Sequence, residues 1–193
     1  KSFGFRKGRN AHQAIQLATA CHQRQTRKGT NVPYVLHCTE AGMIASQLVN
    51  DNGTIDEAIV AAAILHDTME DAFLSYAALE EMFTTRVADL VQSQSENKAN
   101  TWRERKEATI AFIANEATWD EEVITLADKL SNMRAIARDY AAYGDAFWTK
   151  FNAGKEKQQW YYTSLANAFR HTTQTREYAE YRALLAEVFG EAA

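Results

Sequence analysis

A histidine and an aspartate stand side by side at the end of the most apolar stretch of the chain. His66 and Asp67 follow the apolar run from Ala58 to Leu65, and polar residues continue to Asp71. An imidazole and a carboxylate together suit a divalent metal ion such as Mn²⁺. Neighbouring residues point about 100° apart on a helix, so both can face one ion only where the helix frays or ends. The polar residues after Leu65 allow such an end, so His66 and Asp67 form a candidate metal site.

Two further candidate ligands, His37 and Asp128, lie within apolar helical patterns elsewhere in the chain. A carboxylate on a buried face costs on the order of several kcal/mol unless a cation accompanies it, so a buried Asp128 requires a cation. Spacing alone leaves alternatives open. Asp128 can instead be a surface residue paired with Lys129 or Arg134, and His37 can be a core or capping histidine.

The elements that must position these side chains are predicted to be helices. Apolar residues recur at helical spacing almost throughout, and the chain holds one proline and eight glycines. We predict an all-α fold of about eight to ten helices around the metal site. The predicted helices cover residues 10–26, 35–51, 54–68, 75–83, 85–94, 101–117, 119–139, 145–171 and 176–189. An exposed, mobile loop is expected at residues 92–100, and a turn at Asn52 and Gly53.

Local signals refine these boundaries. Three capping boxes, each a threonine followed three residues later by a glutamate, are predicted to begin helices at Thr54 with Glu57, Thr101 with Glu104, and Thr118 with Glu121. Aromatic residues in the last two helices are expected to pack in the core rather than to stack on a base: Trp160, Tyr161, Tyr162, Tyr178 and Tyr181.

Length and charge narrow the class of protein. The length of 193 residues predicts one domain over residues 1–193. Because the net charge is −4, we do not expect a nucleic-acid or anionic-membrane partner. The longest apolar run has eight residues, too short to span a bilayer, and the basic start of the chain does not read as a secretory signal. Cys21 and Cys38 are expected to be reduced thiols, which predicts a cytoplasmic protein. A homo-oligomer is compatible with the sequence.

Three motifs occur in order on successive predicted helices. They are Pro-Tyr-x-x-His ending at His37, His-Asp-x-x-Glu-Asp beginning at His66, and Leu-Ala-Asp-Lys-x-x-Asn ending at Asn132. Together they resemble the HD superfamily of metal-dependent phosphohydrolases. More narrowly, residues 10–140 are similar to the hydrolase domain of RelA/SpoT-type alarmone enzymes and to the stand-alone small alarmone hydrolases.

The resemblance implies roles for the residues in the motifs. It implies that one Mn²⁺ is bound by four ligands: His37, His66, Asp67 and Asp128. It also implies that Glu70 and Asp71 orient or deprotonate the attacking water. Glu70 lies one helical turn past Asp67, so it can reach a water on the metal without being a ligand.

Further residues match substrate-contacting positions of the family. Asn132 lies four residues past Asp128 on the same helix face, and resembles an asparagine that contacts the nucleotide. The pair Arg27 and Lys28 resembles one that contacts base and phosphates, and Arg105 and Lys106 lie in a basic stretch similar to one near the distal phosphates. The alternative for both basic pairs is a solvated surface.

The chain also departs from the family pattern. Cys38 stands where the family usually has proline, and Ala135 stands where long alarmone enzymes often carry a hydroxyl that helps to hold the nucleoside. The segment after residue 140 resembles no synthetase and is too short to hold one. We therefore expect the chain to degrade an alarmone and not to make one. The expected partner is a small-molecule nucleotide.

The resemblance implies a Mn²⁺-dependent 3′-pyrophosphohydrolase that converts ppGpp or pppGpp to GDP or GTP and pyrophosphate. Two alternatives stay open. One is the same metal chemistry on another nucleotide, such as an adenine alarmone or the 2′-phosphate of NADPH. The other is a binding protein that sequesters a nucleotide or acts as an antitoxin.

Overall fold

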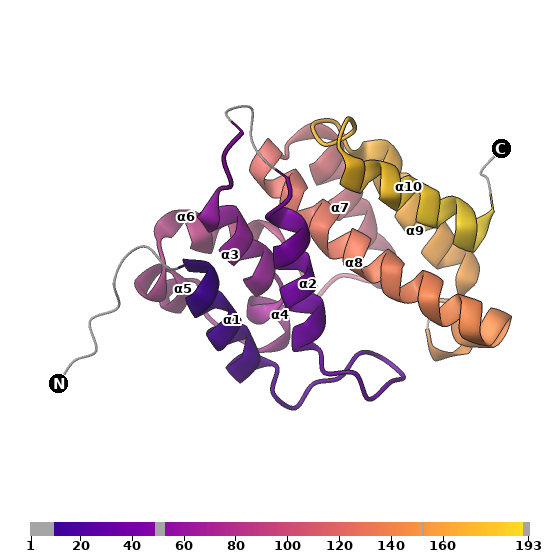
Figure 1. Ribbon diagram of the computed structural model, residues 1–193, viewed down its shortest axis with the longest axis horizontal. Helices are drawn as coiled ribbons and strands as arrows, with labels where there is room; N and C mark the ends of the chain where they lie inside the picture. Colours follow the sequence, from indigo (N-terminus) through magenta and orange to yellow (C-terminus); the bar gives the residue numbers. More distant parts are fainter. Residues whose placement is uncertain (1–9, 49–52, 152, 191–193) are drawn as a thin grey trace.

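The chain folds as a set of packed helices, which confirms the predicted all-α class (Figure 1). The computed structural model describes residues 10–48, 53–151 and 153–190, and within them the only strand-like pairing is one bridge between Thr26 and Pro33. The helices are α1 (Asn10–Cys21), α2 (Val35–Ala45), α3 (Glu57–Leu65), α4 (Thr68–Asp71), α5 (Tyr76–Met82), α6 (Thr85–Ser93), α7 (Trp102–Asn115), α8 (Trp119–Tyr143), the 3-10 helix η1 (Gly144–Lys150), α9 (Lys155–Ala168) and α10 (Arg176–Phe189).

Helix α3 is the centre of the packing. Its residues from Ile59 to Leu65 are all buried, as expected for a helix that is apolar on every side. It packs against α1, α2, α6 and α8. The long helix α8 runs from this group towards α9 and α10, as Figure 1 shows. The two helices α3 and α8 therefore connect all parts of the core.

Local chemistry explains where the helices begin. Thr101 and Thr118 each form the predicted capping box with the glutamate three residues later. The predicted cap at Thr54 is wrong, because Asp56 caps α3 and accepts a hydrogen bond from the amide of Ala58 at 2.9 Å. A carboxylate two residues nearer to the apolar run thus replaces the threonine as the N-cap.

Several predicted helices are too long. The predicted helix 35–51 ends at Ala45, and the predicted helix 10–26 ends at Cys21. Asn52 of the predicted turn lies outside the described residues, while Gly53 has a φ of +68°. The predicted helix 54–68 is also too long, since α3 ends at Leu65 and a separate short helix, α4, begins at Thr68.

The predicted helix 145–171 is wrong as a single element. It is divided into η1 and α9, because Phe151 has extended backbone angles and Gly154 has a φ of +43°. A residue without a Cβ adopts such a positive φ at little cost. The core role predicted for the aromatic residues is confirmed: Tyr161, Tyr162 and Tyr181 are buried, and Trp160 and Tyr178 pack against them.

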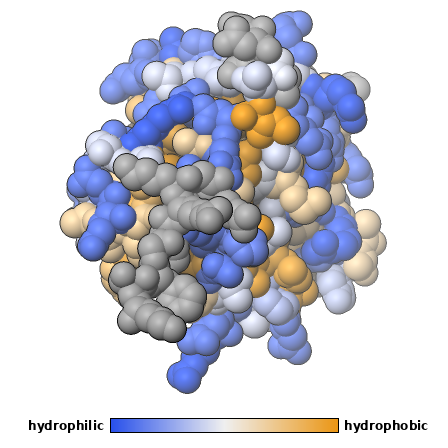
Figure 2. All heavy atoms as spheres, turned by 60° about the vertical axis from the view of Figure 1, so that its left-hand side comes forward, coloured by the Kyte–Doolittle hydropathy of each residue, from blue (hydrophilic) through white to orange (hydrophobic). Residues whose placement is uncertain are grey.

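The surface is mainly hydrophilic on the face that Figure 2 shows. Figure 2 shows one face, on which hydrophilic side chains predominate and apolar side chains form separate small patches. Among the described residues, no helix is both long enough and apolar enough to cross a membrane.

A glycine permits the close approach of α2 and α3. A Cβ added at Gly42 would overlap Cγ1 of Ile64 and lie 2.9 Å from its Cδ1. This approach places His37, near the start of α2, close to the end of α3 where His66 follows.

We expect Gly42→Ala to destabilise the protein by about 1–3 kcal/mol, because overpacking at the α2 and α3 contact outweighs the better helix propensity of alanine. Denaturant unfolding measures the change. In a double-mutant cycle, Ile64→Ala should remove most of the penalty, because it deletes the atoms that the new Cβ meets. A Gly42→Ala protein more stable than wild type would contradict this account.

Candidate functional site

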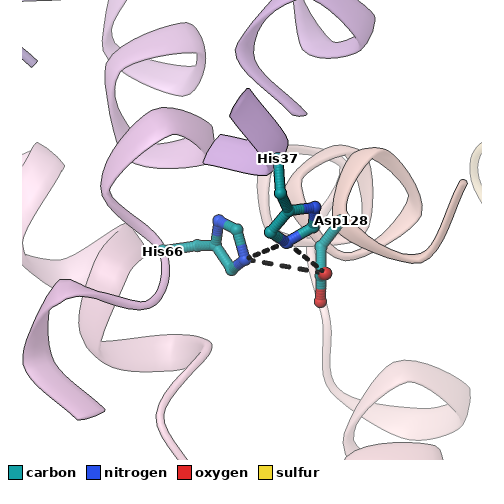
Figure 3. Close-up of side chains that lie close together, drawn as sticks. All are labelled: His37, His66 and Asp128. Carbon is teal, nitrogen blue, oxygen red and sulfur yellow. Dashed lines mark hydrogen bonds and ion pairs between the residues drawn. The ribbon is translucent and has the colours of Figure 1, made fainter. Parts of the chain in front are cut away.

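Three candidate ligands meet between helices α2, α3 and α8 (Figure 3). His37 Nε2 lies 3.3 Å from His66 Nε2 and 3.3 Å from Asp128 Oδ1, and His66 Nε2 lies 3.6 Å from the same oxygen. All three residues are buried. His37 comes from the first turn of α2, His66 directly follows α3, and Asp128 is in the middle of α8.

The fourth predicted ligand, Asp67, lies beside this cluster. Its Oδ2 is 2.9 Å from His66 Nε2 and 3.8 Å from His37 Nε2. The helix break after Leu65 lets both neighbours reach the same point. Tyr34 donates a hydrogen bond of 2.5 Å from its hydroxyl to this oxygen, and so holds the carboxylate.

The two imidazoles each direct Nε2 into the cluster. His66 Nδ1 is 2.8 Å from the carbonyl oxygen of Ala63, and a carbonyl can only accept, so Nδ1 carries a proton. His37 Nδ1 is 2.8 Å from the hydroxyl of Ser131. Two nitrogen donors and two carboxylates make a mixed set that fits a divalent transition-metal ion with open positions for further ligands.

The buried ionisable groups strongly shift one another's pKa values. Burial opposes ionisation of Asp67 and Asp128, but the neighbouring imidazoles and, for Asp128, Lys129 more than offset it and lower the pKa of both carboxyls. Burial lowers the pKa of His37, whereas the two carboxylates raise the pKa of His66 well above its ordinary value despite its burial. The cluster therefore attracts positive charge.

Lys129 supplies part of that charge. Its Nζ lies 2.5 Å from Asp128 Oδ2, and both side chains are largely buried. The alternative of a surface Asp128 is wrong, although the pairing with Lys129 is present. Arg134 pairs elsewhere, with Glu40 and Glu180.

A cavity of about 300 Å³ opens beside the cluster. Its lining includes His66, Asp67 and Asp128 together with Glu70. An oxygen of Glu70 accepts a hydrogen bond from the amide of Glu96, and burial raises the pKa of the Glu70 carboxyl. The structure thus brings Glu70 to the same cavity as the candidate ligands.

Asp71 does not line that cavity. Its carboxylate is 42% exposed and lies 3.2 Å from Lys98 Nζ, which also donates to the backbone carbonyl of Glu70 at 2.8 Å. Its own carbonyl accepts a hydrogen bond from Gln25. Asp71 therefore contacts the segment that carries Glu70.

Arg105 and Lys106 line the same cavity. Both contact Glu96, with Arg105 Nε at 2.9 Å and Lys106 Nζ at 2.6 Å from its carboxylate oxygens. Part of the loop predicted at 92–100 is consequently half-buried: residues 93–96 are not exposed, and they line the cavity. The expectation of a wholly exposed loop is wrong, because Glu96 anchors the loop to α7.

A second cavity, of about 210 Å³, contains the other predicted substrate contacts. Arg27, Lys28 and Asn132 line it, together with Tyr34 and Ala135. Arg27 Nη2 donates to Asn132 Oδ1 at 2.9 Å, and Asn132 Nδ2 donates to Asp128 Oδ1 at 2.6 Å. This chain of hydrogen bonds links the second cavity to the candidate metal site.

Three contacts were not anticipated from sequence. Tyr34 lies three residues before His37, and this spacing could have indicated a shared face. Ser131 lies three residues past Asp128, so the same spacing could have placed both on one helix face. The contact between Glu96 and the basic residues of α7 joins a loop to a helix, and no spacing rule could have found it.

Comparisons with known proteins identify the family of the chain. The HD domain family model matches residues 14–159. The guanosine-3′,5′-bis(diphosphate) 3′-pyrophosphohydrolase MESH1 of Drosophila melanogaster is 33% identical over 125 residues, which cover 64% of this chain and 68% of the relative. The bifunctional (p)ppGpp synthase/hydrolase SpoT of Escherichia coli is 31% identical over 129 residues, which cover 64% of this chain and 18% of SpoT.

Solved structures give the same result for the fold. The crystal structure of lmo0812 from Listeria monocytogenes has a TM-score of 0.72 and 29% identity, and the match covers 80% of this chain and 99% of that one. The structure of a metazoan ortholog of SpoT, described as hydrolysing ppGpp, has a TM-score of 0.77 and 24% identity over 97% of this chain and 100% of its own.

We expect Lys129→Met to lower the free energy of unfolding by about 3 kcal/mol at neutral pH, because it removes the lysine cation that pairs with the buried Asp128 carboxylate. The pKa of Asp128 is depressed in the folded chain. The stability that this ionised group contributes is therefore present above about pH 3.9 and is lost as the pH falls through the folded value. The difference between variant and wild type should shrink below about pH 4.

Urea unfolding at several pH values measures this effect. Lys98→Met is the matched control, since Lys98 is 55% exposed and its loss should cost less than about 1 kcal/mol. Equal costs for the two variants would show that Asp128 does not depend on Lys129.

Proposed function

Because the chain belongs to the HD domain family, we propose that it is a Mn²⁺-dependent 3′-pyrophosphohydrolase. It converts guanosine 3′,5′-bispyrophosphates to GDP or GTP and releases pyrophosphate. The observation that carries this proposal is the convergence of His37, His66, Asp67 and Asp128 between two cavities with basic linings, in a chain similar to MESH1.

The proposed roles follow from the two cavities. His37, His66, Asp67 and Asp128 hold Mn²⁺, which when bound polarises a phosphoryl oxygen and lowers the pKa of a water molecule. Arg105 and Lys106 bind phosphates in the larger cavity. Arg27, Lys28 and Asn132 bind the nucleoside in the smaller one.

Glu70 is the proposed general base. It shares the larger cavity with the ligands, and its raised pKa makes the carboxylate a better proton acceptor than an ordinary glutamate. Asp71 acts on it indirectly, since both the Asp71 carboxylate and the Glu70 carbonyl contact Lys98. Asp71 therefore positions Glu70 rather than touching the substrate.

The remaining assignments are proposed on similar grounds. One domain accounts for residues 1–193, because the described buried residues form one cluster from α1 to α10. The proposed partner is a small-molecule nucleotide, and neither a nucleic acid nor a membrane is proposed. A cytoplasmic location and a homo-oligomer stay predictions. Ala135 lines the smaller cavity without a polar group, so the identity of the base is left to measurement.

The test is hydrolysis of ppGpp by the full chain after removal of metal by a chelator, with and without added Mn²⁺. We expect release of pyrophosphate and GDP that needs Mn²⁺ and falls below detection in Asp67→Ala, which removes a candidate ligand. Circular dichroism of the variant confirms that it is folded.

The same assay with ppApp and NADPH tests the alternatives. Faster turnover of either nucleotide than of ppGpp would overturn the guanine assignment and keep the metal chemistry. Nucleotide binding without turnover of any of the three would indicate a binding protein instead.

We expect Glu70→Gln to lower kcat by about 10²- to 10⁴-fold, the range for loss of a general base, with little change in Mn²⁺ affinity. Asp71→Asn makes the same chemical change one residue away, and it should lower kcat by less because Asp71 does not line the cavity. Steady-state kinetics at saturating Mn²⁺ provide the comparison. A larger effect of Asp71→Asn would reverse the two proposed roles.

A further inference from the structure

A chain of side-chain hydrogen bonds runs outward from His37 and crosses three helices. His37 Nδ1 lies 2.8 Å from Ser131 Oγ, and Ser131 Oγ lies 2.8 Å from Glu40 Oε2. Arg134 donates to Glu40 at 3.1 Å and pairs with both oxygens of Glu180 at 2.6 and 2.7 Å. This series, which we call the Ser131 chain, joins α2, α8 and α10 behind the candidate ligand.

The hydrogen bonds of the Ser131 chain have one fixed donor-to-acceptor direction. Glu40 faces the guanidinium of Arg134, so it accepts hydrogen bonds and has no proton to give. The single hydroxyl proton of Ser131 is therefore donated to Glu40. The serine oxygen can then only accept from His37, so Nδ1 of the imidazole must carry the proton.

This direction determines which nitrogen of His37 is free. In a neutral imidazole with its proton on Nδ1, the lone pair is on Nε2. Nε2 is the atom that lies 3.3 Å from both His66 Nε2 and Asp128 Oδ1. The opposite tautomer would direct an N–H group into the cluster and could not bind a metal ion through that atom.

Burial makes the serine hard to replace. His37 is 4% exposed and Ser131 is 1% exposed, so water does not readily substitute for the hydroxyl at Nδ1. His66 depends instead on the backbone carbonyl of Ala63, which no substitution removes. Of the two imidazoles, only His37 has a tautomer that is set by side chains.

We propose that Ser131 and Glu40 are positioning residues that hold His37 in the Nδ1–H tautomer, with the Nε2 lone pair directed at the metal. The proposal rests on the proposed role of His37 as a ligand. Hydrogen-bond partners behind a metal-binding histidine fix its tautomer and orientation, and their loss typically lowers metal affinity by about 10- to 100-fold.

Two variants test the chain at different links. Ser131→Ala removes the acceptor at Nδ1. Glu40→Gln keeps the shape but adds an amide donor, which lets Ser131 donate to His37 and so favours the Nε2–H tautomer. Glu180→Gln is the matched control, because it makes the same change on the other side of Arg134 and leaves the Glu40 contacts in place.

The first readout is Mn²⁺ affinity, measured by electron paramagnetic resonance of the free ion. We expect the dissociation constant to rise about 10- to 100-fold in Ser131→Ala and Glu40→Gln, and to stay within about twofold in Glu180→Gln. Wild-type affinity in Ser131→Ala would overturn the proposal. An equal loss in Glu180→Gln would also overturn it, because the effect would then be one of helix packing.

The second readout is the tautomer of His37 in the metal-free protein, from the nitrogen chemical shifts of the imidazole. We expect Nδ1–H in wild type and Glu180→Gln, and a shift towards Nε2–H in Glu40→Gln. Nε2–H in wild type would overturn the proposal. This measurement needs no metal, so a wild-type protein that fails to bind Mn²⁺ would contradict the proposed function while the tautomer still decides this inference.

Discussion

The structure depends on the burial of ionisable groups inside a helical core. His37, His66, Asp67 and Asp128 meet where α2, α3 and α8 converge. Buried carboxylates are costly unless cations and hydrogen bonds accompany them. Each of these four residues has such partners, which come from α2, α3, α8 and the segment before α2. The helices around the site are held together by polar contacts as well as by apolar packing.

Helix α8 carries most of the connections between the site and its surroundings. Asp128 faces the cluster, Lys129 neutralises it, and Asn132 links it to the smaller cavity. Ser131 reaches His37 behind the cluster. Because residues three and four positions apart share a helix face, one turn of α8 can contact the metal site, a cavity and α2 together.

The sequence predicted the helical class because that class depends on local patterns. Spacing indicated the candidate ligands that the structure brings together, but for His37 and Asp128 it left core and surface alternatives open. The apolar run before His66 determines a buried helix, and the following polar residues determine where it ends. Boundaries were harder to predict where two local signals compete, as Thr54 and Asp56 do at the start of α3. The burial of Glu96 between Glu70 and α7 depends on tertiary packing, which no periodicity in the sequence records.

The balance of charge in the larger cavity bears on the proposed binding of a metal ion and an anionic substrate there. Four carboxylates and three cationic side chains line it, and the raised pKa of His66 supplies a fourth positive charge when no ion is bound. The cavity is then close to neutral, and its basic residues are already paired with Glu96 or Asp128. A divalent ion bound in place of the proton of His66 would change the balance by one positive charge. In the proposed function, the attraction for phosphate would therefore come from the ion together with the basic residues of α7.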